Sequence, residues 1–391
     1  MKVDFSNTRI AFLSKSSQEL HQAHFLFKTL ASPAMVNTGK SLTKFALRLG
    51  LPIKGVIKST VYRQFVGGES IEECKPAIQK LAERHVRAIL DYSAEGKENE
   101  AHFDKTARIT KMTIDEATRN PGIPLTVFKP TGMFRFGLLE KVNAKAHLSE
   151  KESDEWRRGL DRFNGVIQYA VERSIPIMVD AEETWIQDVI DELVEDQMRI
   201  HNREKALVFN TLQFYRWDRL DYLKDLAERA RTEGFKVGIK IVRGAYMEKE
   251  NERAEDMGYP TPIQPDKESA DRDYNDALRF ITDNIDLITL VSGTHNENSN
   301  QVLVDLMNEK GIDKNDERVW FAQLYGMSDH ISFNLAHHGF NVVKYLPFGP
   351  VEDVMPYLFR RAEENTSVAG QTGRELSLIE KELRRRKTDN D

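Results

Sequence analysis

The stretch ALVFNTLQFYRWDRLDYLKDLAERARTEGFKVGIKIV, residues 206–242, contains the unit from which the fold is built. Its two ends, Ala206–Asn210 and Val237–Val242, are short runs of the apolar residues that form buried strands. Between them, Arg216–Glu233 has helical periodicity and stops at Gly234, a residue typical of helix C-termini. A strand, a helix and a second strand in this order predict a parallel sheet, because the helix returns the chain over the sheet face.

The same alternation continues along the chain from about residue 85. The candidate strands are Val86–Tyr92, Leu125–Pro130, Ile175–Asp180, Ala206–Asn210, Val237–Val242, Ile288–Ser292, Val319–Gln323 and Val342–Leu346. Helical patterns between them include Ser153–Arg173, Thr184–Glu204, Lys267–Ile285 and Asn298–Lys310. Eight strands in about 280 residues match a (β/α)8 TIM-like barrel, and an open doubly wound sheet is the alternative.

The domain organisation follows from where the strand rhythm begins and ends. The first 84 residues have helical periodicity without strand candidates, so we expect an N-terminal helical arm at 1–84, the barrel at 85–370 and a C-terminal helical tail at 371–391. The basic run Arg384-Arg385-Arg386-Lys387 in this tail is expected to be a solvated, frayed end.

The composition is that of a globular protein, with 40% apolar and 30% charged residues among 391. No run of about 18 apolar residues is present, so no membrane span is expected. The one cysteine, Cys74, cannot form an internal disulfide and suits a reducing compartment. The first residues, Met1–Phe5, have no features of a secretory or organelle leader, and the expected location is the cytoplasm.

Charge is unevenly distributed along the chain. The net charge of −6 argues against general affinity for nucleic acid, yet the span between Glu19 and Glu69 contains no acidic residue. Two interpretations of this basic arm remain open. Its helices present a solvated face that complements the acidic remainder of the chain, or they form a patch that contacts anionic lipid headgroups.

Familiar cofactor and metal motifs are absent from the sequence. No G-x-G-x-x-G follows a strand candidate, and neither a P-loop nor H-E-x-x-H occurs. No cysteine and histidine set has zinc spacing, so no metal site is expected. Any nucleotide cofactor must therefore be held by the barrel itself.

Active sites of such barrels lie at the C-terminal ends of the strands. In this sequence those ends carry polar side chains almost without exception: Lys129, Asp180, Gln213, Lys240, Arg243, Thr294, His295, Asn296, Gln323 and Tyr345. A ring of this composition around one mouth suits a polar, anionic ligand.

The segments at these ends resemble the signature segments of the proline dehydrogenase family. They are MVDAEET (178–184), IKIVRGAY (239–246), SGTHNE (292–297), FAQLYGM (321–327) and KYLPFGPVEDVMPYLFRRAEEN (344–365). The resemblance covers roughly residues 85–370 in unbroken order. It implies a distorted (β/α)8 barrel that binds FAD across the strand ends and oxidises L-proline to Δ1-pyrroline-5-carboxylate by hydride transfer.

The resemblance also implies a substrate site. Arg360 and Arg361 would grip the carboxylate of proline, for which the planar, permanently charged guanidinium fork is suited. The remaining substrate residues would be Lys129, Asp180, Leu324, Tyr345 and Glu364. In this scheme Asp180 pairs with Lys129, and Glu364 and Asp180 hold the arginine pair. The alternative is that Arg360 only pairs with Glu364 along the helix. Tyr345 would pack on the proline ring and favour unsubstituted proline.

Lys240 would lie beside the flavin N5 atom, where a cation stabilises the reduced, anionic flavin. Lys240 and Asp180 are the expected catalytic residues. The other expected FAD contacts are Ala181, Gln213, Arg243, Gly244, Ala245, Thr294, His295, Asn296 and Gln323. Many bacterial members carry arginine where this chain has Lys240 and lysine where it has Arg243, so this pair resembles the mitochondrial branch.

The expected electron acceptor is a membrane quinone, which would give the basic arm a purpose at the inner face of the cytoplasmic membrane. The second step, oxidation of the product to glutamate, is expected from a separate dehydrogenase. Alternatives are a hydroxyproline-oxidising enzyme of the same fold, a methylenetetrahydrofolate reductase-type barrel, and, in a different class, an inactive membrane-peripheral regulator.

Overall fold

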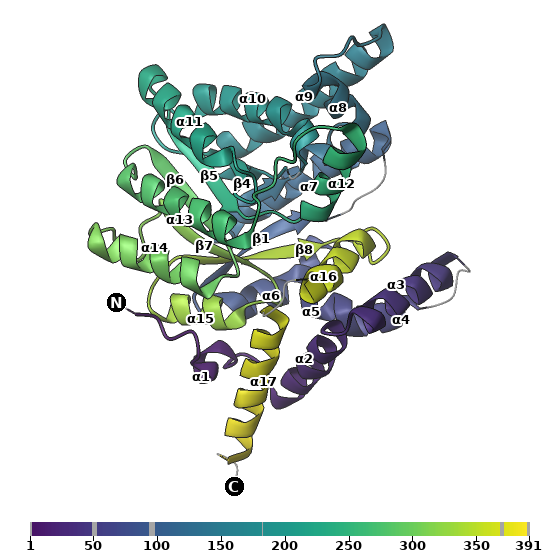
Figure 1. The fold of residues 1–391 in the computed structure, drawn as a ribbon, viewed down its shortest axis with the longest axis vertical. Coiled ribbons are helices and arrows are strands. Elements are labelled where there is room, and N and C mark those ends of the chain that lie inside the picture. Colours follow the sequence, from purple (N-terminus) through teal and green to yellow (C-terminus); the bar gives the residue numbers. More distant parts are fainter. Residues whose placement is uncertain (1, 49–52, 94–97, 182, 368–370, 389–391) are drawn as a thin grey trace. The chain divides into compact units, whose positions relative to one another are not determined.

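The computed structural model describes residues 2–48, 53–93, 98–181, 183–367 and 371–388, with backbone alone for 44–48, 364–367 and 371–372. Two compact units make up the chain (Figure 1). The first contains Met1–Lys2 and Lys97–Ala322, and the second contains Val3–Gly96 and Gln323–Asp391. The second unit therefore joins the two ends of the sequence.

Eight parallel strands, each in the expected place, follow the sheet order β1-β8-β7-β6-β5-β4-β3-β2. They are β1 (Val86–Tyr92), β2 (Thr126–Phe128), β3 (Ile177–Val179), β4 (Val208–Gln213), β5 (Val237–Val242), β6 (Ile288–Gly293), β7 (Val319–Leu324) and β8 (Val342–Phe348). Helices separate successive strands, and the predicted fold class, a distorted (β/α)8 barrel, is confirmed.

Strand β4 begins and ends later than the predicted Ala206–Asn210. The side-chain oxygen of Asn202 accepts hydrogen bonds from the backbone N–H groups of Leu207 and Val208, both at 2.9 Å, so the chain before β4 is held by a side chain. Pairing with β5 continues as far as Gln213 opposite Val242. Gln213 is therefore fixed within the sheet.

The helices of the first unit include the one that the sequence predicted to stop at Gly234. They are α7 (Glu100–Arg119), α8 (Phe136–Asn143), α9 (Glu150–Val171), α10 (Thr184–His201), α11 (Arg219–Glu233), α12 (Met247–Met257), α13 (Lys267–Asp283) and α14 (Glu297–Glu309). Gly234 ends α11 with a φ of 74°, in the left-handed region that favours glycine. Asp266 caps α13, because its side chain accepts from the N–H of Ser269.

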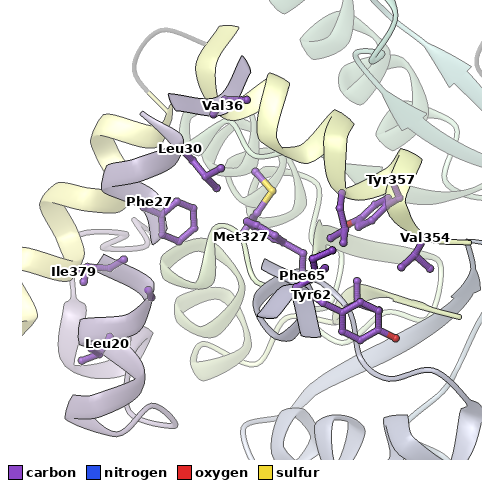
Figure 2. Packing of buried hydrophobic residues seen from close by; sticks show 14 of the residues in the cluster. Leu20, Phe27, Leu30, Val36, Tyr62, Phe65, Met327, Val354, Tyr357 and Ile379 are labelled. Atoms are coloured by element: carbon purple, nitrogen blue, oxygen red, sulfur yellow. The ribbon is translucent and has the colours of Figure 1, made fainter. Parts of the chain in front are cut away.

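The second unit contains helices from both ends of the sequence, and most of them contribute to one apolar core. They are α1 (Thr8–Ala11), α2 (Ser17–Leu30), α3 (Pro33–Arg48), α4 (Lys54–Ile57), η1 (Lys58–Tyr62), α5 (Arg63–Phe65), α6 (Ile71–Ala82), α15 (Asp329–His337), α16 (Met355–Ser367) and α17 (Gln371–Thr388). Figure 2 shows Phe27, Phe65, Met327, Tyr357 and Ile379 gathered in this core. The N-terminal helices are therefore part of a shared core.

The prediction of a solvated, frayed C-terminal run was wrong for Arg385 and Arg386, whereas the Arg384 side chain is 76% exposed. Glu382 is fully buried and accepts hydrogen bonds from Arg385 at 2.7 Å and Arg386 at 2.8 Å. Arg386 also donates to the backbone carbonyls of Phe12 and Lys15, both at 2.8 Å. These acceptors lie some 370 residues away in the sequence. Local sequence gives no signal for such partners.

Several lysines of the basic arm are neutralised within the second unit. Lys15 lies 2.9 Å from Asp329 and Lys54 lies 2.7 Å from Glu352, while Lys40 pairs with Glu363. These three lysines therefore pair with acidic residues of later segments of the chain. This agrees with the first interpretation, in which the basic arm complements the acidic remainder. Among the helices that the structure describes, none is both long and apolar enough to cross a membrane.

An ion triad of Lys15, Asp329 and Lys344 lies in the second unit. Asp329 accepts from Lys15 and from the fully buried Lys344, each at 2.9 Å. Burial alone would raise the pKa of the Asp329 carboxyl, but the two lysines outweigh burial and hold this pKa far below its ordinary range. Both ammonium groups thus share this carboxylate, and the buried Glu375 adds a further negative charge near them.

Replacing this carboxylate by its amide should destabilise the protein strongly. We expect Asp329→Asn to lower the free energy of unfolding by about 3–5 kcal/mol, because two ammonium groups lose their counter-ion. Since the folded pKa of Asp329 is lowered, the wild-type advantage is present above an unfolded pKa of about 4 and is lost as the pH falls through the folded value. Urea denaturation at neutral pH measures the change.

The matched control is Asp283→Asn, because Asp283 pairs with Lys310 at an exposed position where its side chain is 62% accessible. Its effect should stay below about 1 kcal/mol. Equal losses in both variants would contradict the role assigned to the triad.

Candidate functional site

In the first unit, polar side chains lie at or near the ends of β3, β4, β5 and β6. The parallel register brings these strand ends to one edge of the sheet. Among these side chains are two centres, the ion pair Asp180–Lys240 and the amide of Gln213.

The first centre is a buried ion pair. Lys240 Nζ on β5 lies 2.5 Å from Asp180 Oδ1, directly after β3, and Lys240 is only 5% exposed. Thr211 Oγ1 of β4 lies 3.0 Å from the same carboxylate oxygen. Removing two charges from water costs more than an ion pair normally returns, so such a pair is weak evidence for a stabilising role. Its position at the strand ends favours a functional role.

The second centre is Gln213, which is buried at the last position of β4. Its amide nitrogen donates to the backbone carbonyl of Ala181 and, at 3.1 Å, to Gln187 Oε1. Its own carbonyl oxygen is buried and has no hydrogen-bond partner among the residues that the structure describes. An unsatisfied buried oxygen is costly, so this atom is suited to accept a hydrogen bond from a ligand.

Arg243, directly after β5, ties three further elements together. Its guanidinium donates to Asp271 of α13 at 2.6 Å, to Thr294 after β6 at 2.8 Å and to Ser299 of α14 at 2.9 Å. The plane also lies over the Tyr274 ring, 4.4 Å from its centroid. The expected cofactor residues Arg243 and Thr294 are thus brought into direct contact.

The structure also shows the local surroundings of the remaining expected cofactor residues of this unit. Gly244 has a φ of 131°, and a Cβ there would lie 2.5 Å from the Tyr215 ring, so backbone and packing already require glycine. Asn296 uses its side-chain oxygen to cap α14, accepting from Ser299 N–H at 3.0 Å. Ala245 is exposed, His295 is half-buried, and Lys129 is half-buried directly after β2.

The expected substrate residues other than Lys129 and Asp180 lie in the second unit. Tyr345 is buried in β8, and Leu324 ends β7 half-buried. Arg361 of α16 is 7% exposed, with its guanidinium 5.2 Å from the Tyr357 ring centroid, whereas its neighbour Arg360 is half-buried. The side chain of Glu364 lies outside the described residues. Gln323 accepts from Ser332 of α15 at 2.8 Å.

Sequence reasoning missed several polar residues behind the site. Gln187 and Asp191, one turn apart on α10, contact Gln213 and Asn210. Their spacing among Ile186 and Ile190 places two polar side chains on a buried helix face, a signal that could have been noticed.

Glu250 of α12 was also missed. This carboxylate is fully buried and accepts from Thr184 N–H at 2.8 Å and Thr184 Oγ1 at 2.6 Å. Helix α10 has no side-chain cap of its own, so Glu250 caps it from another helix. The loop after β3 is thereby linked to the helix after β5. Within the described part of the chain, no group of three or more histidine, cysteine or acidic residues could hold a metal ion.

Comparison with known proteins gives a consistent result. The family model described as proline dehydrogenase matches residues 74–374. Similar curated proteins include the carbapenem antibiotics biosynthesis protein CarD of Pectobacterium carotovorum subsp. carotovorum, 36% identical, with 85% of this chain and 86% of that protein covered. Proline dehydrogenase 1, mitochondrial, of Dictyostelium discoideum is 30% identical over 98% of this chain and 75% of that protein.

A hydroxyproline dehydrogenase of Xenopus laevis is also 30% identical, over 96% of this chain and 88% of that protein. Among solved structures, proline utilization A (PutA) from Bdellovibrio bacteriovorus, inactivated by N-propargylglycine, matches with a TM-score of 0.73 and 21% identity. That likeness covers 92% of this chain and 38% of the larger one, and it shows the shared fold.

A double-mutant cycle should reveal strong coupling between Asp180 and Lys240. We expect Lys240→Met to cost about 3–5 kcal/mol of unfolding free energy, because Asp180 is left without its cation. The double variant Asp180→Asn/Lys240→Met should cost less than the sum of the two single variants, by about 1–3 kcal/mol. Additive losses in urea denaturation would show that the two groups do not interact.

Proposed function

This chain belongs to the proline dehydrogenase family, and we propose that it oxidises L-proline to Δ1-pyrroline-5-carboxylate with FAD as its bound electron acceptor. The family model covers residues 74–374, which include all five segments quoted from the sequence. The observation that carries the proposal is the buried Lys240–Asp180 pair at the strand ends, together with the buried Gln213 amide, whose oxygen has no donor among the described residues.

The residues of the first unit fit a flavin cofactor. Gln213 offers a buried carbonyl oxygen to an N–H group, and Lys240 offers a buried positive charge. Thr294 and Arg243 are held beside one another by their own hydrogen bond. Bound FAD would supply the two-electron acceptor that takes hydride from the ring carbon next to the proline nitrogen.

The protein's own groups would contribute charge and position. Lys240 would stabilise negative charge that develops on the acceptor ring, and a fixed charge in a site without water is more effective than one in solvent. Asp180 would hold Lys240 in place through their ion pair. The proline amine must lose its proton before the reaction, because its lone pair drives hydride departure, and no single residue is assigned as the base.

Arg360 and Arg361 are proposed to bind the proline carboxylate. A guanidinium stays charged when it is buried, and its parallel N–H groups match the two carboxylate oxygens. The low exposure of Arg361 supports this assignment, since burial strengthens a charge-assisted hydrogen bond. Lys129, Leu324, Tyr345 and Glu364 are proposed to complete the substrate site.

Hydroxyproline is the second candidate substrate, because a hydroxyproline dehydrogenase is similar over nearly the whole chain. The bulk of the buried Tyr345 favours proline, which carries no ring hydroxyl. The ratio of kcat/KM for the two substrates decides between them.

Substituting the buried arginine should weaken substrate binding selectively. We expect Arg361→Met to raise KM for L-proline by about 10- to 100-fold, because a charge-assisted hydrogen bond worth ~1.5–3 kcal/mol is lost. The assay follows loss of the flavin absorbance band after L-proline is added without oxygen. Arg157→Met is the control, because the Arg157 side chain is 71% exposed. A colourless protein that does not bind FAD would refute the proposed function itself.

Electrons are proposed to pass to a membrane quinone, with the protein in the cytoplasm and peripheral to the inner face of the membrane. The product would pass to a separate dehydrogenase. The first 60 residues expose several large apolar side chains, namely Leu13, Phe25, Met35, Leu42 and Val56. From Phe25 onward these side chains lie in the span between Glu19 and Glu69, which contains basic residues but no acidic ones, a combination suited to anionic lipid.

The fraction of protein that binds to lipid vesicles tests whether this surface contacts membranes. We expect the double variant Phe25→Ser/Leu42→Ser to bind phosphatidylglycerol vesicles several-fold less than wild type, because Phe25 and Leu42 are 72% and 62% exposed and would insert between lipids. Ile200→Ser removes an apolar side chain that is 60% exposed in the first unit and should bind as wild type does. Equal vesicle binding by all three proteins would show that the N-terminal arm does not contact lipid.

A further inference from the structure

A chain of buried hydrogen bonds lies behind Gln213 and ends at a carboxylate. Asp191 of α10 is 4% exposed and accepts from Gln187 Nε2 at 2.7 Å, from Asn210 Nδ2 at 2.7 Å and from Arg219 Nη1 at 2.8 Å. Gln187 in turn accepts from Gln213 Nε2 at 3.1 Å. Asp191, Gln187, Asn210, Arg219 and Gln213 thus form one continuous hydrogen-bond network within the first unit, here called the relay.

The network has a fixed direction. Burial raises the pKa of the Asp191 carboxyl, but all three neighbouring groups are donors and therefore favour its charged form. A carboxylate can only accept, so Gln187 must turn its amide nitrogen toward Asp191 and its oxygen toward Gln213. Gln213 must then turn its nitrogen toward Gln187.

A second acceptor enforces the same orientation. The Gln213 nitrogen also donates to the backbone carbonyl of Ala181, which cannot donate in return. A flipped Gln213 amide would place its oxygen against two acceptors at once. The carbonyl oxygen of Gln213 is therefore the atom left for a ligand, and it is the buried oxygen without a described partner.

We propose that Gln187, anchored by Asp191, is a positioning residue that fixes the Gln213 amide so that its oxygen receives the imide N–H of the flavin ring. This inference rests on the proposed function, since it requires FAD. The oxidised flavin ring carries one N–H group, at N3 between two carbonyls, so an oriented acceptor selects this edge of the ring. The relay thus sets which end of the amide the cofactor meets.

The same carboxylate supports the other centre of the site. Asn210 donates to Asp191 and accepts from the N–H of Thr211 at 2.8 Å. Thr211 Oγ1 lies 3.0 Å from Asp180, the partner of Lys240. One buried anion on α10 therefore underlies both the amide and the ion pair.

The test compares the affinities of the apoprotein for FAD and for N3-methyl-FAD, which lacks the donor. Fluorescence titration gives both dissociation constants. Wild type should bind FAD at least about fivefold more tightly than the methyl analogue, the size of one hydrogen bond. Gln187→Met should lower this ratio, because the Gln213 amide is then held by the Ala181 carbonyl alone and can turn more readily to accommodate either ligand. Gln213→Met, which removes the acceptor itself, should do the same.

Gln197→Met is the matched control, since Gln197 is a buried glutamine of the same helix outside the relay. It should retain the wild-type ratio, and thermal unfolding of each apoprotein verifies that it is folded. A wild-type ratio near one, or an unchanged ratio in folded Gln187→Met or Gln213→Met, would overturn the relay while leaving FAD binding intact. Failure of wild type to bind FAD at all would instead refute the proposed function.

Discussion

A positive charge held almost out of water is the constraint on which the site depends. Lys240 projects from β5 at 5% exposure, and its ammonium group needs a counter-ion at that depth. Asp180 supplies the counter-ion from the end of β3, and Thr211 of β4 lies against the same carboxylate. Three neighbouring strands must therefore keep their register for the pair to exist, so the position of the charge depends on the sheet.

The support for this constraint comes from residues that never need to touch a ligand. Asp191 and Gln187 orient groups on β4, and Glu250 caps the helix that follows β3. Arg243 joins the end of β5 to α13, to α14 and to Thr294 after β6. Side chains fixed by several partners lose little entropy when a cofactor binds, which is the physical meaning of preorganisation.

The strands were predictable because the signal for each is local. β1 and β5 have the predicted bounds, and every other strand lies within a few residues of its apolar run. The displacement of β4 was not predictable, because Asn202 competes with the sheet for the backbone N–H groups of Leu207 and Val208. The C-terminal arginines were misjudged for the same reason, since the acceptors of Arg386 lie at the other end of the chain.

Strand ends alone indicated Asp180, Gln213, Lys240 and Arg243 as polar neighbours, whereas roles for Arg360 and Arg361 came from family resemblance. The relay behind Gln213 could not be derived from spacing, because Asp191 meets Asn210 and Arg219 through tertiary packing. Gly244 was expected for cofactor access, and the structure adds backbone conformation and the Tyr215 ring as reasons. Local patterns locate such residues, and only three-dimensional packing explains them.

The composition of the second unit has a consequence for biosynthesis. Its core joins Phe27 and Phe65 to Met327, Tyr357 and Ile379, so its first and last contributors are separated by more than three hundred residues of chain. Contacts of such long sequence separation form late and slowly. During translation the amino-terminal helices emerge first, yet their apolar faces stay uncovered until the final helix has left the ribosome, and this interval is when chaperones are most needed.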